Sequence, residues 1–138
     1  MDFELRPATE AGRRYVELCE EHAIDFATRA DAHDRDGSFP FENLDALQES
    51  GVLSATLPVE YVGFGIESLQ DLAAGLNRLA RGDGSTAIAA QMHLAAAMSV
   101  TRLWNTAKAT GDATATAAAT DNATATATAN GHGEGRRR

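Results

Sequence analysis

Cysteine is almost absent from the 138-residue sequence, which contains only Cys19. No disulfide can form within this sequence, and no zinc site built on several cysteines can be assembled. A single small thiol is typical of a buried apolar position. His22 and His33 lie eleven residues apart on one expected helix, too far for shared ligation, so we predict no metal site.

Long hydrophobic runs are also missing. The longest candidate begins near Ala87, but Gln91, His93 and Ser99 interrupt it before the roughly 18 apolar residues that span a bilayer. The first ten residues carry acidic side chains and no apolar segment, unlike a secretory signal. We therefore expect a soluble, cytoplasmic protein with no membrane partner.

Basic residues are scarce, with 12 Lys and Arg against 20 Asp and Glu, for a net charge of −8. Up to Asn105 there are 17 acidic and 8 basic residues, which gives 8 − 17 = −9. Nucleic acids and anionic membranes are bound through clustered Lys and Arg. The sequence therefore excludes nucleic-acid binding as its expected function.

Apolar residues recur every three or four positions in the first third of the sequence, as on one face of a helix. This spacing predicts a first helix from Thr9 to about His33, which ends before the turn signal Asp36-Gly37. A second helix is expected to begin at Pro40 and to end at Gly51 as a left-handed cap. Its short apolar stripe consists of Phe41, Leu44 and Leu47.

Residues 53–66 contain Pro58, Gly63 and Gly65 with little helical period, and we expect an ordered loop there. A third helix follows. Ser68 and Asp71 resemble a capping box with Asp in place of Glu, and the Arg81–Gly84 segment ends the helix. Its expected apolar face consists of Leu69, Leu72, Ala73, Leu76, Leu79 and Ala80.

A fourth helix is expected from Ser85, capped by Ser85 or Asp83, to about Trp104. This segment is apolar on nearly all sides, which is typical of a helix in a protein interior. A four-helix unit of this size surrounds such a helix only partly. We therefore predict that one face contacts a partner, which is another domain, another subunit or a ligand, and that residues 85–104 support a hetero- or homo-oligomer.

The composition changes abruptly after Asn105. The 33 residues that follow contain 11 Ala and 8 Thr and no Leu, Ile, Val, Phe, Met, Trp or Tyr. Such a segment cannot build a core, so we predict a folded domain over 1–105 and a disordered Ala/Thr-rich tail over 106–138. One hypothesis is that the tail comes from repetitive DNA or a shifted reading frame, which the nucleotide sequence after codon 105 tests.

Three segments resemble the N-terminal helical domain of the acyl-CoA dehydrogenase family. They are Ser38–Glu42 followed by Leu44, Leu47 and Ser50–Leu53; the loop Leu57–Gly65; and Leu76–Ser85 followed by Ala87–His93. Their order and spacing carry the resemblance, because each segment alone is unspecific. One departure is Val62, which stands where the family usually has a glycine. If that position has positive φ, a β-branched side chain is strained there by about 1 kcal/mol or more.

The resemblance implies an all-α fold, an up-down bundle of about four to five helices. In intact relatives this domain packs on a β-barrel domain and a C-terminal helical bundle around FAD. The implied reaction is oxidation of the CH–CH group of an acyl-CoA thioester. The catalytic base belongs to segments that this sequence lacks, so we assign no catalytic residue and expect the chain to be inactive alone. Two alternatives stay open: a fragment of a flavin-dependent monooxygenase of the same fold, and a non-catalytic module that pairs with a separate flavoenzyme chain.

The resemblance also implies which residues line the acyl end of a substrate pocket. They are Ala89, Met92, His93 and Ala96 on the fourth helix. The alternative is that this face packs against the sibling helices, with His93 as a hydrogen-bonded core residue. The turn Asp83-Gly84-Ser85 opens the same helix, where phosphate sites occur, but helix capping explains it sufficiently.

Overall fold

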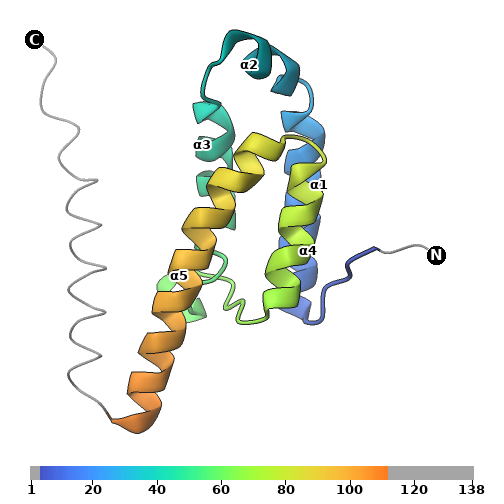
Figure 1. Ribbon diagram of the computed structural model, residues 1–138. Helices are drawn as coiled ribbons and strands as arrows, with labels where there is room; N and C mark the ends of the chain where they lie inside the picture. The colour runs from blue at the N-terminus through green and yellow to red at the C-terminus, as the bar shows by residue number, and fades with distance from the viewer. Residues whose placement is uncertain (1–3, 112–138) are drawn as a thin grey trace, which may run out of the picture. The chain divides into compact units, whose positions relative to one another are not determined.

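A computed structural model describes residues 4–111 of the chain (Figure 1). The described residues contain helices and no strand, which confirms the all-α prediction. The elements in chain order are α1 (Glu10–Phe26), α2 (Ala30–Asp36), α3 (Phe41–Glu49), the 3₁₀ turns η1 (Val52–Ser54) and η2 (Val59–Tyr61), α4 (Leu69–Ala80) and α5 (Gly84–Thr110). Within residues 4–111 the chain divides after Met98 into two units, and the following description concerns the first unless stated.

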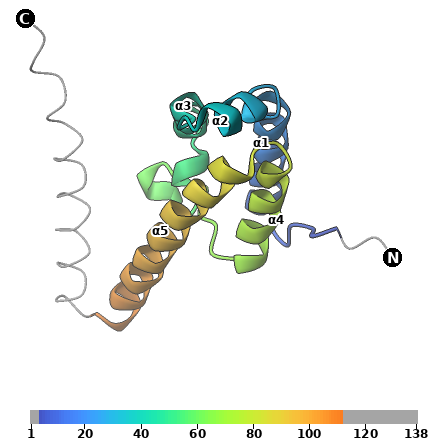
Figure 2. The ribbon, with the colours of Figure 1, turned by 45° about the horizontal axis from the view of Figure 1, so that its top comes forward.

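The up-down arrangement follows from the directions of four helices (Figures 1 and 2). α1 and α4 lie side by side and run in the same direction, whereas α3 and the start of α5 run in the opposite direction. At both ends of the α1/α4 pair a glycine lets the two segments come close together. A side chain at Gly12 would collide with the Asp71 carboxylate, and one at Gly82 would collide with the backbone of Ala23.

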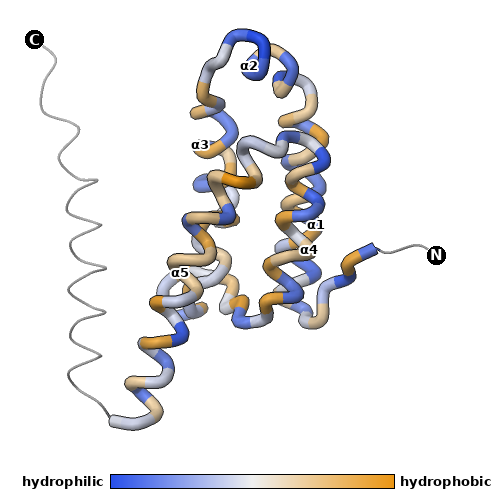
Figure 3. Tube along the Cα trace, viewed as in Figure 1, coloured by the Kyte–Doolittle hydropathy of each residue, from blue (hydrophilic) through white to orange (hydrophobic). Residues whose placement is uncertain are grey.

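The first predicted helix is two helices, so the expectation of one helix to His33 was wrong. Thr9 caps α1 as its hydroxyl accepts from Gly12 N at 2.9 Å. At the other end the Thr28 hydroxyl donates to the carbonyl of Asp25 at 2.7 Å, and the Thr28 amide donates to the same carbonyl at 3.1 Å. This local pairing competes with the helical pattern, because Ser and Thr side chains offer the backbone an alternative partner. α2 then starts anew and has no buried residue; it is mostly blue in Figure 3.

α3 corresponds to the predicted second helix. Its predicted end is confirmed, because Gly51 after the helix has φ 81°, in the left-handed region. Its stripe differs from the prediction, because Phe41 is 69% exposed and packs edge-on against Phe39 with ring centroids 4.7 Å apart. Leu47 is buried as expected, and Asn43 is fully buried on the same side.

The loop before α4 has the shape that the sequence predicts, with η2 as its one regular turn. Val62 ends η2 with φ 65° and ψ 17°, the left-handed region. The next residue, Gly63, lies so close to the carbonyl of Leu57 that a side chain there would collide with it. Val62 is therefore the residue that adopts the conformation for which the family uses glycine, and its side chain is exposed.

α4 packs its buried side on α1. Ser68 caps it by accepting from Asp71 N at 3.3 Å, as predicted. Leu72 and Leu79 are buried, but Leu69 is 65% exposed, so the predicted apolar face is shifted. The core consists of Tyr15, Cys19, Phe26, Leu47, Val52, Ala55, Ile66, Leu72, Leu79, Ala87, Ala90, Leu94 and Met98.

α5 starts where the sequence predicts and extends past Trp104 to Thr110, where Gly111 has φ 68°. The additional turn contains alanine, the strongest helix former, and needs no core contact to be helical. The remaining predicted tail, residues 112–138, lies outside the described residues. Within 4–111 no helix is long and apolar enough to cross a membrane.

Candidate functional site

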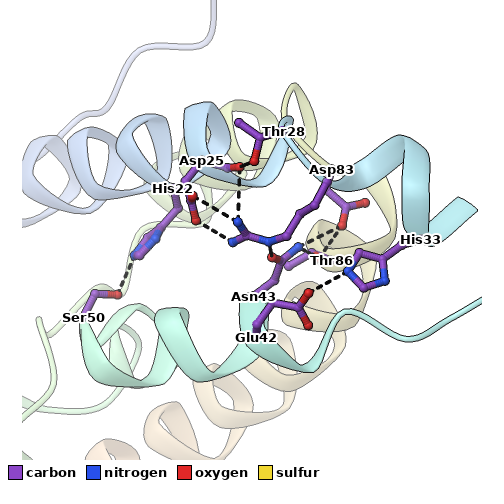
Figure 4. A network of polar contacts seen from close by, with 10 residues as sticks. His22, Asp25, Thr28, His33, Glu42, Asn43, Ser50, Asp83 and Thr86 are labelled. Atoms are coloured by element: carbon purple, nitrogen blue, oxygen red, sulfur yellow. Dashed lines mark hydrogen bonds and ion pairs between the residues drawn. The ribbon is translucent and has the colours of Figure 1, made fainter.

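A buried amide joins three elements at the start of α5. Asn43 Nδ2 donates to Asp83 Oδ2 at 3.1 Å and to Thr86 Oγ1 at 2.9 Å (Figure 4). Its Oδ1 accepts from Arg29 Nε at 2.6 Å. Asn43 has no exposed surface, so these contacts replace the water that the amide loses on folding. The network fixes α3 against the α1–α2 junction and the first turn of α5.

Asp83 caps α5, as one of the two predicted capping residues. Its Oδ1 accepts from Ser85 N at 2.9 Å, and its Oδ2 accepts from Thr86 Oγ1 at 2.6 Å. The negative charge of Asp83 thus stabilises the N-terminal, positive end of the α5 helix dipole. Because that negative charge already lies where a phosphate would bind, the geometry agrees with capping as the explanation of the Asp83-Gly84-Ser85 turn.

Arg29 is held by opposite charge and by an aromatic ring. Its guanidinium contacts the Asp25 carboxylate at 2.5 Å and lies 5.2 Å from the ring centroid of Phe26. The hydrogen bond from Arg29 holds the pKa of Asp25 below its usual value, and the same bond raises the pKa of Arg29. Arg29 therefore stabilises the fold. Its guanidinium is already paired within the protein and is not available to bind another anion.

A second buried polar group ties the residues before α1 to α4. Asp71 Oδ1 accepts from Ala8 N at 2.5 Å, and Asp71 Oδ2 accepts from Thr9 Oγ1 at 2.6 Å. Two turns later, Arg78 contacts Glu20 at 2.6 Å and Glu4 at 3.0 Å. Sequence reasoning identified Asp71 only as a capping residue and missed Arg78. The available signal was its spacing, because Arg78 lies four and three residues after Ala74 and Gly75, two small residues that leave room on that side of the helix.

A hollow of about 560 Å³ lies between α2 and the start of α5. Asp31, Asp34 and Asp83 make it acidic, while about half of its lining surface is apolar and includes Pro40 and Ile88. The lining residues are Ala30, Asp31, His33, Asp34, Gly37, Ser38, Pro40, Gly82, Asp83, Gly84, Ser85 and Ile88. No group of three or more His, Cys, Asp or Glu side chains in residues 4–111 is placed to hold a metal ion.

The predicted pocket residues lie together on α5, on the side that this unit leaves open. Met92 is 73% exposed, His93 and Ala96 are exposed, and Ala89 is half-buried. His93 Nε2 lies 3.0 Å from the carbonyl oxygen of Leu53, so it has a hydrogen-bond partner but is not a core residue. Packing against the sibling helices falls instead to Ala87, Ala90, Leu94 and Met98.

Comparison with known proteins finds one family and a group of longer relatives. Residues 10–126 match the acyl-CoA dehydrogenase N-terminal domain. The chain is 37% identical over 98 residues to L-evernosamine nitrososynthase of Micromonospora sp., covering 71% of this chain and 23% of the relative. It is 37% identical over 82 residues to the putative acyl-CoA dehydrogenase YdbM of Bacillus subtilis, covering 59% and 21%.

A solved structure matches at the level of the fold and of the sequence. The crystal structure of KijD3 in complex with FMN and dTDP-3-amino-2,3,6-trideoxy-4-keto-3-methyl-D-glucose superposes with a TM-score of 0.72 and 37% identity. The superposition covers 82% of this chain and 27% of that chain. In each comparison this chain therefore spans about a quarter of the length of the relative.

Proposed function

We propose, since the chain belongs to the acyl-CoA dehydrogenase family through its N-terminal domain, that it forms one wall of the substrate cavity of a flavin-dependent oxidoreductase. The observation that carries this proposal is the open face of α5. Met92 is 73% exposed and Ile88 is 63% exposed, although both are large and apolar. Enclosing each of them stabilises a complex by about 1.5–3 kcal/mol. The predicted lining residues Ala89, His93 and Ala96 lie on or beside this face.

The substrate class that we favour is a nucleotide-linked amino sugar. A relative named as an L-evernosamine nitrososynthase and a structure that holds an amino-sugar nucleotide both share 37% identity with the chain. Oxidation of an acyl-CoA is the second candidate, which the family match and the similarity to YdbM favour. Both candidates require a flavin. FAD is the cofactor that the family resemblance implies, and FMN is the one in the KijD3 structure.

The buried and half-buried cationic and amide groups of the described residues are not available to a flavin. A flavin phosphate needs free cationic or amide donors. Arg78 is buried and Arg29 is half-buried, and both are already paired with carboxylates. The buried amide of Asn43 is likewise saturated within the chain. We therefore derive no catalytic step for this chain and propose that the flavin contacts come from additional protein, in the same or in a separate polypeptide.

The experiment combines the purified chain with L-evernosamine nitrososynthase from which the matched segment is deleted. We expect a complex that binds flavin and oxidises an amino-sugar nucleotide, whereas the chain alone does neither. Met92→Glu is expected to abolish the complex. Ile24→Glu is the matched control, because Ile24 is 75% exposed on α1, away from this face, and the added charge is the same.

Two results contradict the proposal. One is stoichiometric flavin binding and turnover by the chain alone, with either an amino-sugar nucleotide or an acyl-CoA. The other is full activity of the shortened relative without the added chain. Turnover of acyl-CoA but not of the amino sugar by the complex keeps the role as a cavity wall and selects the second substrate class.

A further inference from the structure

A histidine at the rim of the hollow connects a hydroxyl to a carboxylate. His33 Nδ1 lies 2.8 Å from Ser38 Oγ, and His33 Nε2 lies 2.8 Å from Glu42 Oε1 (Figure 4 shows His33 and Glu42). We propose that Ser38, His33 and Glu42 form a nucleophilic triad that hydrolyses small, uncharged or cationic acyl esters. This activity is separate from the flavin chemistry proposed above and uses other residues.

The polarity of the two hydrogen bonds suits proton transfer from the serine. An ionised carboxylate only accepts, so His33 Nε2–H donates a hydrogen bond to Glu42, which fixes the tautomer that has a lone pair on Nδ1. That lone pair then accepts the Ser38 hydroxyl proton. Hydrogen bonds from its own backbone amide and from His33 hold the pKa of Glu42 below its usual value, which keeps it ionised. Serine hydrolases likewise combine a serine, a histidine base and an orienting acid, although there the serine binds Nε2 and the acid binds Nδ1, whereas here the two ring nitrogens have exchanged roles.

Ser38 is presented on a fixed turn. Gly37 has φ 61°, and the Ser38 amide donates to the carbonyl of His33 at 3.1 Å, so the serine follows directly after the closed end of α2. The residue is exposed, whereas the His33 side chain is 18% exposed. A substrate therefore reaches the hydroxyl, and the base is partly shielded from water.

The hollow sets the class of ester. Ser38 and His33 line it on one side, and Gly84 at the start of α5 lines it as well. Ile88 offers an apolar surface to a short acyl group. Asp31 and Asp34 repel anions, so phosphate-bearing thioesters such as acyl-CoA are unsuited to this site.

A second serine–histidine pair in the same unit lacks this polarity. His22 Nε2 lies 2.8 Å from Ser50 Oγ, but the Ser50 hydroxyl donates to the carbonyl of Leu47 at 3.2 Å. Because the Ser50 hydroxyl proton points to Leu47, Ser50 Oγ accepts a hydrogen bond from His22 Nε2. His22 therefore cannot take the serine proton, and Ser50 is not activated. Ser50 is therefore a matched control for Ser38.

The reaction consumes one ester and one water. Ser38 Oγ attacks the ester carbonyl as its proton moves to His33 Nδ1, and the bond to the leaving oxygen breaks. That oxygen takes the proton from His33; where it leaves as a stable phenolate, His33 releases the proton to the solvent instead. Water then attacks the acyl-serine with His33 as base, the carboxylic acid leaves, and the Ser38 hydroxyl regains its proton. No redox step or cofactor is involved.

The test uses the full chain with p-nitrophenyl acetate and identifies the acetylated residue by mass spectrometry. We expect acetyl-Ser38 and a rate above the buffer background that Ser38→Ala lowers about tenfold or more, and Glu42→Gln likewise. Ser50→Ala is expected to retain the rate of the unmodified chain. Ser38 is exposed, so its alanine variant should melt as the unmodified chain does.

Acetylation elsewhere with Ser38 unlabelled overturns the proposal. So does a Ser38→Ala variant with an unchanged rate, or an equal loss in Ser50→Ala. Melting curves of all variants are recorded alongside, so that a loss of rate with an intact fold is attributed to the triad. The flavin experiment above is distinguishable from this one, because its variant is at Met92, which does not line the hollow, whereas the variants here are at Ser38 and Glu42.

Discussion

Replacing Val62 by glycine should stabilise the protein, although it removes a side chain. Val62 has φ 65° and ψ 17°, a conformation in which the Cβ of an L-residue lies too close to its own backbone. The side chain is 86% exposed, so its removal exposes no core. The strain is therefore released without a packing cost.

The magnitude is the difference of two terms. The left-handed conformation costs an L-residue roughly 1–2 kcal/mol. Glycine gives the unfolded chain more freedom, which costs about 0.4–1 kcal/mol. Taking the middle of each range, we expect Val62→Gly to increase the free energy of unfolding by about 0.8 kcal/mol, which for a domain of this size raises Tm by roughly 3–6 °C.

Urea and thermal unfolding followed by circular dichroism measure this change. Val59→Gly is the control: Val59 is 74% exposed in the same turn but has no positive φ, so that substitution should destabilise the domain. Val62→Asn should lie between the two, because Asn tolerates the left-handed region. A Val62→Gly variant that unfolds at or below the midpoint of the unmodified chain refutes the strain argument.

Three further predictions concern buried polar and titratable groups. Asp71→Ala should lower the free energy of unfolding by about 3 kcal/mol, measured in urea, because hydrogen bonds to a charged group are worth about 1.5–3 kcal/mol; an unchanged midpoint would exclude a stabilising role for this carboxylate. Burial lowers the pKa of His22, so its contribution to stability is complete above the unfolded value of 6.5 and declines as the pH falls below it. His22→Gln should remove that part of the pH dependence, which is measured as the change in the urea unfolding midpoint between pH 7.5 and pH 5.5. An equal change in the variant and in the unmodified chain would count against this role of His22. Burial raises the pKa of Cys19 to about 12, so iodoacetamide should alkylate it only after unfolding, and rapid labelling of the native chain would disprove its burial.

Helical periodicity and turn chemistry predicted most of the fold. The caps at Ser68 and Asp83, the left-handed Gly51 and the loop before α4 all follow from local rules, because each depends on a few neighbouring residues. The strained Val62 was also foreseen from its departure from a family pattern. Local rules worked for these caps and turns, whose stabilising partners lie within about four residues, but they missed the break at Thr28.

The parts that sequence reasoning missed depend on partners far along the chain. Asn43 is buried because residues about 40 positions away, Asp83 and Thr86, satisfy its amide, and a periodicity argument therefore assigned the buried face of α3 to Phe41. The break after α1 has a local and a distant cause. Thr28 binds the carbonyl of Asp25, and Arg29 reaches Asn43, which the sequence alone does not reveal.

The exposed face of α5 is a second feature that the sequence predicted only in part. Its apolar character was visible in the sequence, but which residues point away from the core depends on how α5 is rotated against the other helices. That rotation is set by Ala90 and Leu94, which are buried, and it leaves Met92 outside. A methionine exposed to this degree does not stabilise the isolated domain. The exposure of Met92 is the observation from which we propose that further protein covers this face.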